Sequence, residues 1–213
     1  QDAFVGDVLD TFRPQDALAR AEHKLAEAFY RASWLRSDAG FPRTGCAIDI
    51  GASPGGWSHF LRNLGLTVIA VDKGDVVPMD GVEYWRMLGH EALRKLLDTA
   101  DASARRQFVV YVTDANIPPA QTLDMLQAAL PLLAPGAQVV ATMKNTYQTK
   151  QEWLHAKGIA SSRFKGWMAE GSVREVHLLA NTNKETTFWG LCRGEPGHCE
   201  AGTGYVSEFA SLQ

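Results

Sequence analysis

A loop with three glycines follows a short apolar run in the stretch CAIDIGASPGGWSHFL, residues 46–61. The spacing of Gly51, Gly55 and Gly56 lacks the second glycine of the G-x-G-x-x-G fingerprint, which lets backbone approach a pyrophosphate. Binding of a dinucleotide is therefore disfavoured. A helix that begins directly after the loop would still present free backbone N–H groups, and these suit a single carboxylate.

Asp72 lies 21 residues after Gly51, at the end of the next apolar run, where an acid can accept hydrogen bonds from ribose hydroxyls. S-adenosylmethionine combines a ribose, a carboxylate and a positive centre, and Asp49 offers a negative neighbour for its amino group. These residues favour S-adenosylmethionine as the cofactor. The alternative is a tight turn that needs glycine for its geometry, which explains one glycine but explains the PGGW string poorly.

The string DIGASPGGWSHFL resembles the cofactor loop of FtsJ-like RNA ribose 2′-O-methyltransferases, which reads D-L-G-A-x-P-G-G-W. The resemblance runs from about residue 19 to residue 181 and implies a Rossmann-like methyltransferase fold. The segments AVDKGDV and VREVHLLA are closer to the subgroup that modifies large-subunit ribosomal RNA, so ribosomal RNA is the expected partner. No metal is expected. The residues expected to form the cofactor site are Asp49, Gly51, Ser53, Pro54, Gly55, Gly56, Trp57, Asp72 and Asp114.

The family also carries a Lys-Asp-Lys-Glu tetrad of catalytic residues. The resemblance implies that its members are Lys24 in RAEHKLAEAF, Asp114 in FVVYVTDANIPP, Lys144 in QVVATMKNTY and Glu175 in VREVHLLA. A ribose hydroxyl must lose its proton to attack a methyl sulfonium in line, and we expect Lys144 to accept that proton. Each residue also has an ordinary alternative, because a lysine on a helix is usually solvated and Glu175 could pair with Arg174 or Lys165.

The pKa of Lys144 decides whether it can act as a base near neutral pH. Burial and the neighbouring charge of Lys24 would lower that pKa, whereas Asp114 and Glu175, which we expect to orient the two lysines, would raise it. The sequence leaves the balance between these effects open.

An RNA-binding surface is predicted in the segment from residue 144 to residue 174, which contains six basic and two acidic residues in a chain of net charge −3. Aromatic residues are interleaved with these charges, a mixture typical of surfaces that neutralise phosphates and stack bases. The alternative is a mildly basic solvated flank with core aromatics. The candidate RNA-binding residues are Arg20, Lys150, Arg163, Lys165 and Arg174.

Two segments depart from the family pattern. The family often places an acid after the third strand to contact adenine, but VEYWRMLGHEAL has Leu88 and Gly89 there. We expect adenine to be held by backbone or by Glu91 instead. The common D-M-A-P after the fourth strand is replaced by DANIP, so the target loop differs in detail.

The elements that would position these residues alternate between strands and helices. Nearly continuous apolar runs predict strands at residues 47–50, 67–71, 108–112 and 139–143, and helices are predicted at residues 15–34, 56–64, 90–97 and 119–133. Two further runs, residues 175–180 and 187–192, predict an antiparallel edge. The chain is therefore predicted to be α/β, with a mostly parallel sheet covered by helices on both faces.

The composition fits one methyltransferase domain over residues 1–193 and a C-terminal tail over residues 194–213. No apolar run is long enough to cross a bilayer, so no membrane partner is expected. Scattered cysteines favour a reducing compartment, taken as the cytoplasm. Cys192, His198 and Cys199 do not have the spacing of a zinc site.

Two other functions stay open from the sequence. One is a catalytically silent RNA-binding scaffold, because a fold does not guarantee chemistry. The other is a small-molecule methyltransferase, which would agree with the negative net charge but not with the basic segment.

Overall fold

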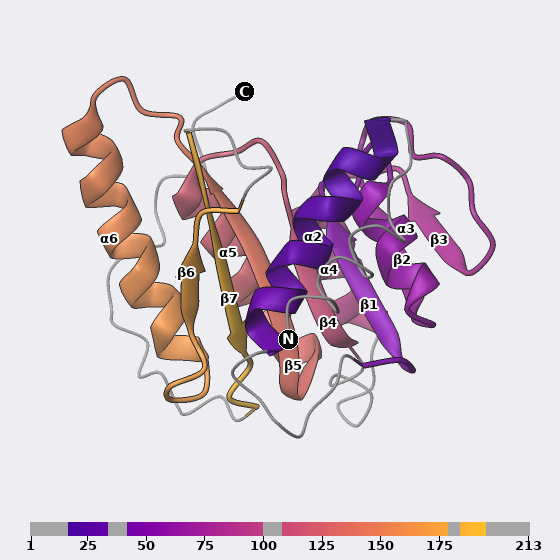
Figure 1. Cartoon of the computed structure of the whole chain (residues 1–213). Helices are drawn as coiled ribbons and strands as arrows, with labels where there is room; N and C mark the ends of the chain where they lie inside the picture. Colours follow the sequence, from indigo (N-terminus) through magenta and orange to yellow (C-terminus); the bar gives the residue numbers. More distant parts are fainter. Residues whose placement is uncertain (1–16, 34–41, 100–107, 179–183, 195–213) are drawn as a thin grey trace, which may run out of the picture.

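The structure, a computed structural model, describes residues 17–33, 42–99, 108–178 and 184–194. Within them, one sheet has the strand order β3-β2-β1-β4-β5-β7-β6 (Figure 1). Pairs from β3 to β5 are parallel, and β7 is antiparallel to both β5 and β6. This confirms the predicted parallel sheet with an antiparallel C-terminal edge. The strands are β1 (Cys46–Ile50), β2 (Thr67–Val71), β3 (Val82–Trp85), β4 (Phe108–Thr113), β5 (Leu133–Lys144), β6 (Arg174–Val176) and β7 (Glu185–Leu191).

Helices cover both faces of the sheet, as predicted. Figure 1 shows α2 crossing in front of the strands, with α4 and α5 behind them. One core lies between the sheet and α2 and α3, and the other lies between the sheet and α4, α5 and α6. The helices are α2 (Ala17–Ser33), α3 (Gly56–Asn63), α4 (Gly89–Thr99), α5 (Pro119–Ala129) and α6 (Lys150–Trp167).

Side chains along each strand alternate between the two cores. In β4, Val110 and Val112 pack on the α2 side with Leu25, whereas Tyr111 packs on the other side with Leu123. Each of these five side chains is at most 1% exposed. Because a central strand is buried on both faces, its sequence is a continuous apolar run rather than an alternating one.

The strand order reverses between β1 and β4, and in open α/β sheets ligands bind outside the carboxyl ends of the strands at such a point. The glycine loop, residues 51–55, follows β1 directly. Asp114 follows β4 directly. The topology therefore brings two of the predicted site elements to the same crevice.

Some elements differ from the prediction. The helix predicted at residues 119–133 ends at Ala129, and a 3₁₀ turn, Leu130–Leu132, leads into a β5 that is longer than predicted. The apolar pattern did not predict α6, because this helix buries only Trp153, Ala160 and Phe164. A capping box does mark its start: the Thr149 hydroxyl accepts the Glu152 N–H, and the Glu152 carboxylate accepts the Thr149 N–H.

The described residues include no helix with the length and apolar character needed to cross a membrane. Cys192 is buried and its backbone bridges to Met168. His198, Cys199 and residues 195–213 of the predicted tail lie outside the described residues.

Candidate active site

Four charged side chains form a closed ring at the carboxyl edge of the sheet. Nζ of Lys24 lies 2.9 Å from Oδ1 of Asp114 and 2.8 Å from Oε2 of Glu185. Nζ of Lys144 lies 2.7 Å from Oδ1 of Asp114 and 2.9 Å from Oε1 of Glu185. Each lysine therefore contacts both carboxylates, and each carboxylate contacts both lysines. The structure brings three of the four predicted catalytic residues together.

The ring closes because its strand residues share one face of the sheet. Lys144 is the direct register partner of Glu185 in the β5–β7 ladder. Val112, two residues before Asp114, packs in the core on the α2 side, as does Val140, four residues before Lys144. Residues two or four apart in a strand point to the same side. All three strand-end side chains therefore point toward α2, which contributes Lys24.

The prediction that Glu175 completes this cluster is wrong. Glu175 is the register partner of Phe188, whose ring packs on Phe164 of α6, so Glu175 faces the opposite side of the sheet. There its carboxylate pairs with the ammonium of Lys157. Glu185 takes the predicted place, and a sequence signal for it existed. The run ETTFWGL begins with this glutamate, and an antiparallel partner of β5 must begin where β5 ends.

The ring sets the charge state of its members. Burial would lower the pKa of Lys144, but Asp114 and Glu185 outweigh it and raise that pKa above its usual value. Burial would raise the pKa of Glu185, but hydrogen bonds from Lys24 and Lys144 outweigh it and lower that pKa. The carboxylates therefore outweigh burial in setting the pKa of Lys144, a balance that the sequence left open. Lys144 carries its proton in this state.

The glycine loop needs glycine at two positions. Gly51 has a φ of 82°, and a Cβ atom there would lie 2.7 Å from Cβ of Ala115 in the loop after β4. Gly55 has a φ of 119°, and a Cβ atom there would lie 3.1 Å from Cγ1 of Val76. Both the left-handed backbone and the close approach of neighbouring loops exclude a side chain. Gly56 follows as the first residue of α3 and is buried.

Asp72 organises the crossing of this loop with the loop after β2. Its Oδ2 accepts the N–H of Ser53 at 3.0 Å, and its Oδ1 accepts the N–H of Gly74 at 2.7 Å. Backbone N–H of Val77 also donates to the carbonyl of Pro54 at 3.0 Å. Asp72 is half-buried, and each carboxylate oxygen keeps acceptor capacity for a hydroxyl. Ser53 and Pro54 are exposed at the loop tip.

Two predicted cofactor residues, Asp49 and Trp57, are enclosed in the protein. Asp49 is 1% exposed and accepts the Ser58 hydroxyl at 2.7 Å. Burial raises the pKa of Asp49 to about 7, Ser58 opposes the shift, and the charges of Asp114 and Asp72 add to it. Trp57 is 3% exposed and packs in the core on the α2 side. These side chains hold the first turn of α3 in place rather than lining an open surface.

Glu91, one of the two predicted ways to hold adenine, already has a backbone partner. Its Oε2 accepts the N–H of Leu88 at 2.9 Å, in the first turn of α4. Leu88 itself is 37% exposed. Contact with adenine stays a prediction for both the backbone and Glu91.

The ring also depends on how α2 is held against α3. Glu22, two residues before Lys24, contacts Nδ1 of His59 on α3, and its side chain is 3% exposed. The rings of Phe29 and Phe60 stack across the same helix pair with centroids 6.0 Å apart. No local sequence pattern marks Glu22 or His59, because their partnership joins residues 37 positions apart.

The structure does not gather the predicted RNA-binding residues on one surface. Arg163 donates to Asp124 of α5 at 2.8 Å, and Arg174 donates to the carbonyls of Gly171 and Val173. Lys150 and Lys165 are exposed at opposite ends of α6. Among the aromatic residues of the segment, Trp153 and Phe164 are buried in the core. Arg20 lies in α2, but its side chain lies outside the part of the chain that is described.

The sequence model of the FtsJ-like methyltransferase family matches residues 17–153, more than half of the chain. The chain belongs to the FtsJ-like methyltransferase family. The match begins with α2 and includes the glycine loop, Asp114 and Lys144, but it ends before β7 and therefore does not reach Glu185.

Individual relatives agree with this assignment. Over 78 residues this FtsJ-like methyltransferase is 42% identical to ribosomal RNA large subunit methyltransferase M of Halorhodospira halophila, covering 34% of this chain and 22% of that protein. Over 66 residues it is 47% identical to the protein of the same name from Aeromonas salmonicida, covering 29% and 17%. The chain thus spans about a fifth of the length of these curated relatives.

A solved structure shows the same fold. A protein from Plasmodium falciparum, described as a ribosomal RNA methyltransferase, superposes with a TM-score of 0.51 at 17% identity, covering 83% of this chain and 98% of that one. The FtsJ-like chain therefore has the Rossmann-like methyltransferase architecture that its sequence predicts.

Proposed function

We propose that this FtsJ-like chain transfers a methyl group from S-adenosylmethionine to a ribose 2′-hydroxyl of RNA, and that the RNA is ribosomal. The observation that carries the proposal is the ring of Lys24, Asp114, Lys144 and Glu185 beside the glycine loop, at the point where the strand order reverses. The names of the relatives from H. halophila and A. salmonicida support ribosomal RNA as the substrate.

The residues at the crevice fit S-adenosylmethionine. Asp72 keeps acceptor capacity for ribose hydroxyls, and the first N–H groups of α3 suit the carboxylate of the methionine moiety. Gly51 and Gly55 let the glycine loop pack directly against Ala115 and Val76, which fixes its backbone beside the ring. The charges of Asp114 and Asp72 add to the raised pKa of the buried Asp49, and a positive ligand beside these carboxylates would relieve that repulsion. When bound, the cofactor would supply an electrophilic methyl group on a positively charged sulfur.

The ring would prepare the ribose for this methyl group. As the oxygen–carbon bond forms and the carbon–sulfur bond breaks, the proton of the 2′-hydroxyl must leave. Lys144 would take that proton and pass it to solvent. Lys24 and Glu185 would fix the position of its ammonium, and Asp114 is the most exposed member, with a side chain 25% exposed. Asp114 is therefore the member nearest to an incoming ligand.

The raised pKa of Lys144 must fall before this lysine can accept a proton. Asp114 is a main cause of the raised pKa. A positive charge bound beside Asp114 would weaken the hold of this carboxylate on Lys144, and exclusion of water by the ribose would add to the effect. We therefore assign the binding of both substrates as the event that turns Lys144 into a base.

The test is transfer of labelled methyl groups from S-adenosylmethionine to total RNA, followed by alkaline hydrolysis. Ribose 2′-O-methylation blocks cleavage at the modified nucleotide, so the label is expected in dinucleotides that resist alkali. Label on a base, on protein or on a small molecule would overturn the proposal. Binding of RNA without any transfer would support the silent scaffold instead.

A further inference from the structure

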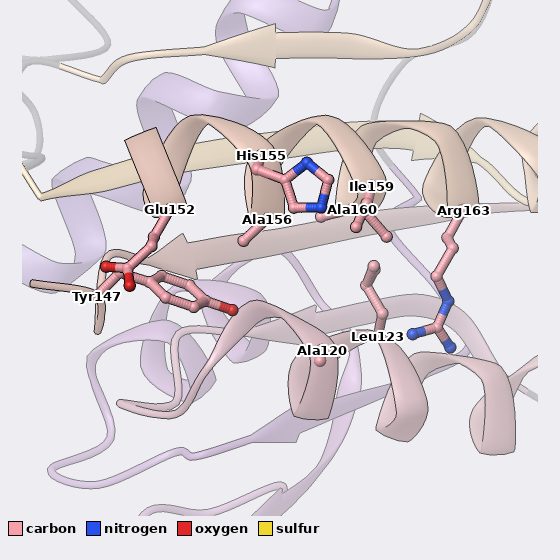
Figure 2. A pocket seen from close by; sticks show the side chains of 9 residues that line it. All are labelled: Ala120, Leu123, Tyr147, Glu152, His155, Ala156, Ile159, Ala160 and Arg163. Carbon is pink, nitrogen blue, oxygen red and sulfur yellow. The ribbon is translucent and has the colours of Figure 1, made fainter. Parts of the chain in front are cut away.

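A cavity of about 220 Å³ lies between α5 and α6, on the face of the sheet opposite to α2 (Figure 2). Its walls include Ala120 of α5 and Ala156 and Ala160 of α6. Tyr147 lies at one end and Arg163 at the other, with the alanines between them. None of these five residues belongs to the ring or to the glycine loop.

The Tyr147 end of the cavity lies at the end of α6 that begins at the carboxyl edge of the sheet. Tyr147 follows Lys144 by three residues, and α5 begins five residues after Asp114. Both α5 and α6 follow parallel strands, so both begin at the carboxyl edge. The Tyr147 end is therefore the end of the cavity nearer to an RNA whose ribose lies at the ring.

The lining suits a flat ring with polar edges. Small alanine side chains, with Leu123 and Ile159, leave a narrow and mostly apolar space between the helices. Polar groups of Tyr147, Glu152, His155 and Arg163 lie at its rim. The guanidinium of Arg163 is held in place by Asp124 at 2.8 Å and by the Gln127 carbonyl at 3.1 Å. Because Asp124 already neutralises this cation, a free phosphate gains little here. An apolar protein helix would offer no partner to the Tyr147 hydroxyl or the His155 ring.

We propose that this cavity binds a nucleobase of the RNA substrate, from a nucleotide close to the one that is methylated. The proposal rests on the proposed function for its ligand class. Single-stranded RNA is read through bases that leave the stack and lie against aromatic side chains or guanidinium planes. Tyr147 and Arg163 offer one of each, and the nucleobase would fix the distance between the cavity and the ring.

Filling the cavity tests this assignment. Ala156→Leu places a larger side chain in the space on a helix that tolerates leucine, and Gln151→Leu places the same side chain at an exposed position of α6 outside the lining. We expect Ala156→Leu to raise KM for RNA and weaken RNA affinity by about tenfold, the effect of losing one stacked base. Gln151→Leu should match the parent, and the affinity of both variants for S-adenosylmethionine should be unchanged.

RNA oligonucleotides with a single abasic position identify the ligand directly. At one position, loss of the base should weaken binding to the parent about tenfold and leave binding to Ala156→Leu unchanged. Tyr147→Ala should show the same insensitivity, and Tyr147→Phe should restore the parental profile because it keeps the ring. Tyr147→Ala also keeps the test valid if Ala156→Leu fails to fold.

Two results would overturn the cavity assignment without touching the proposed function. One is an identical abasic profile for the parent, Ala156→Leu and Tyr147→Ala. The other is self-association that Ala156→Leu abolishes while RNA affinity is unchanged, which would assign the cavity to protein. A different outcome would separate the two proposals. If one abasic position weakens binding to the parent but not to Ala156→Leu, while the methyl label is found on bases, the cavity assignment stands and only the ribose assignment is overturned.

Discussion

The carboxyl edge of the sheet and helix α6 use the same kinds of charged residue under different conditions. At the edge, Lys144 and Glu185 have side chains 13% and 14% exposed, and each has two ionic partners. On the α6 side, Lys157 and Glu175 have side chains 28% and 31% exposed and pair with each other. Burial strengthens electrostatic interactions and makes an unpaired charge costly, whereas water screens an exposed pair. A lysine–glutamate pair therefore indicates chemistry only when it is buried and each of its members has more than one ionic partner.

Replacing one lysine on each side gives the largest contrast. Lys144→Ala should lower the methyl-transfer rate by a factor of about 10² to 10⁴, the usual range for a positioned acid–base group. Lys157→Ala should keep the parental rate, because its pair with Glu175 faces away from the ring. Single-turnover kinetics with saturating RNA measure both. Lys144→Arg should stay inactive, since a guanidinium keeps its proton, and an active Lys144→Arg would reduce Lys144 to a positive charge.

Alanine substitutions of Gly51 in the glycine loop and of Gly166 in α6 should change the stability of the protein in opposite directions. In Gly51→Ala the new Cβ would collide with Ala115 and strain a backbone with φ of 82°. We expect S-adenosylmethionine affinity to fall more than about tenfold, together with a loss of stability of about 1–3 kcal/mol. Gly166 of α6 is exposed and has nothing near its Cβ position. Gly166→Ala should gain about 0.5–1 kcal/mol. Calorimetry and urea unfolding measure the two effects, and tight cofactor binding by Gly51→Ala would count against the loop.

The pH dependence of stability tests the charge states of Glu185 and Lys144. The lowered pKa of Glu185 means that its contribution is complete above the ordinary glutamate pKa of about 4.3 and is lost as pH falls through the lowered value. The raised pKa of Lys144 means that its contribution is complete below about pH 10.4 and is lost as pH rises through the raised value. Urea unfolding of Glu185→Gln should show a shallower loss in acid than the parent. Equal slopes for Glu185→Gln and the parent would contradict the ring.

The smallest expected contrast is in RNA affinity, between substitutions of two lysines at opposite ends of α6. Lys150 lies at the start of this helix near the reactive edge, and Lys165 lies about 22 Å further along. Lys150→Ala should weaken RNA binding a few-fold and reduce the salt slope by about one phosphate contact, with little change for Lys165→Ala. Affinity measured at several salt concentrations decides this. Equal effects of the two substitutions would restore the broad surface that the sequence predicts.

Much of the fold was predictable because buried parallel strands are continuous apolar runs. These runs located β1, β2, β4 and the central part of β5. Helix α6 was missed because few of its residues are buried, so it has no clear apolar pattern. Its capping box at Thr149 and Glu152 is the sequence signal that marks its start. Local sequence therefore reveals an element when the element is buried, and much less when it covers a flank.

Site residues were predictable where they directly follow a strand. They were unpredictable where membership of the site depends on which face of a strand the side chain is on. Asp114 and Lys144 stand at strand ends that the topology brings together. Glu175 and Glu185 lie on neighbouring strands with different register partners, and their side chains point to opposite sides of the sheet, which depends on register. The pairing of Arg163 with Asp124 likewise depends on how α5 and α6 pack, which no local pattern encodes.

Glu185, and not Glu175, completes the ring around Lys144. The most direct test is the pH profile of the methyl-transfer rate for Glu185→Gln and Glu175→Gln beside the parent. Removing a carboxylate that raises the pKa of Lys144 should shift the rising limb of Glu185→Gln to lower pH. Loss of positioning should lower its maximal rate about tenfold to a hundredfold, while Glu175→Gln keeps the parental profile. A shifted limb in Glu175→Gln, with a parental profile in Glu185→Gln, would contradict the account.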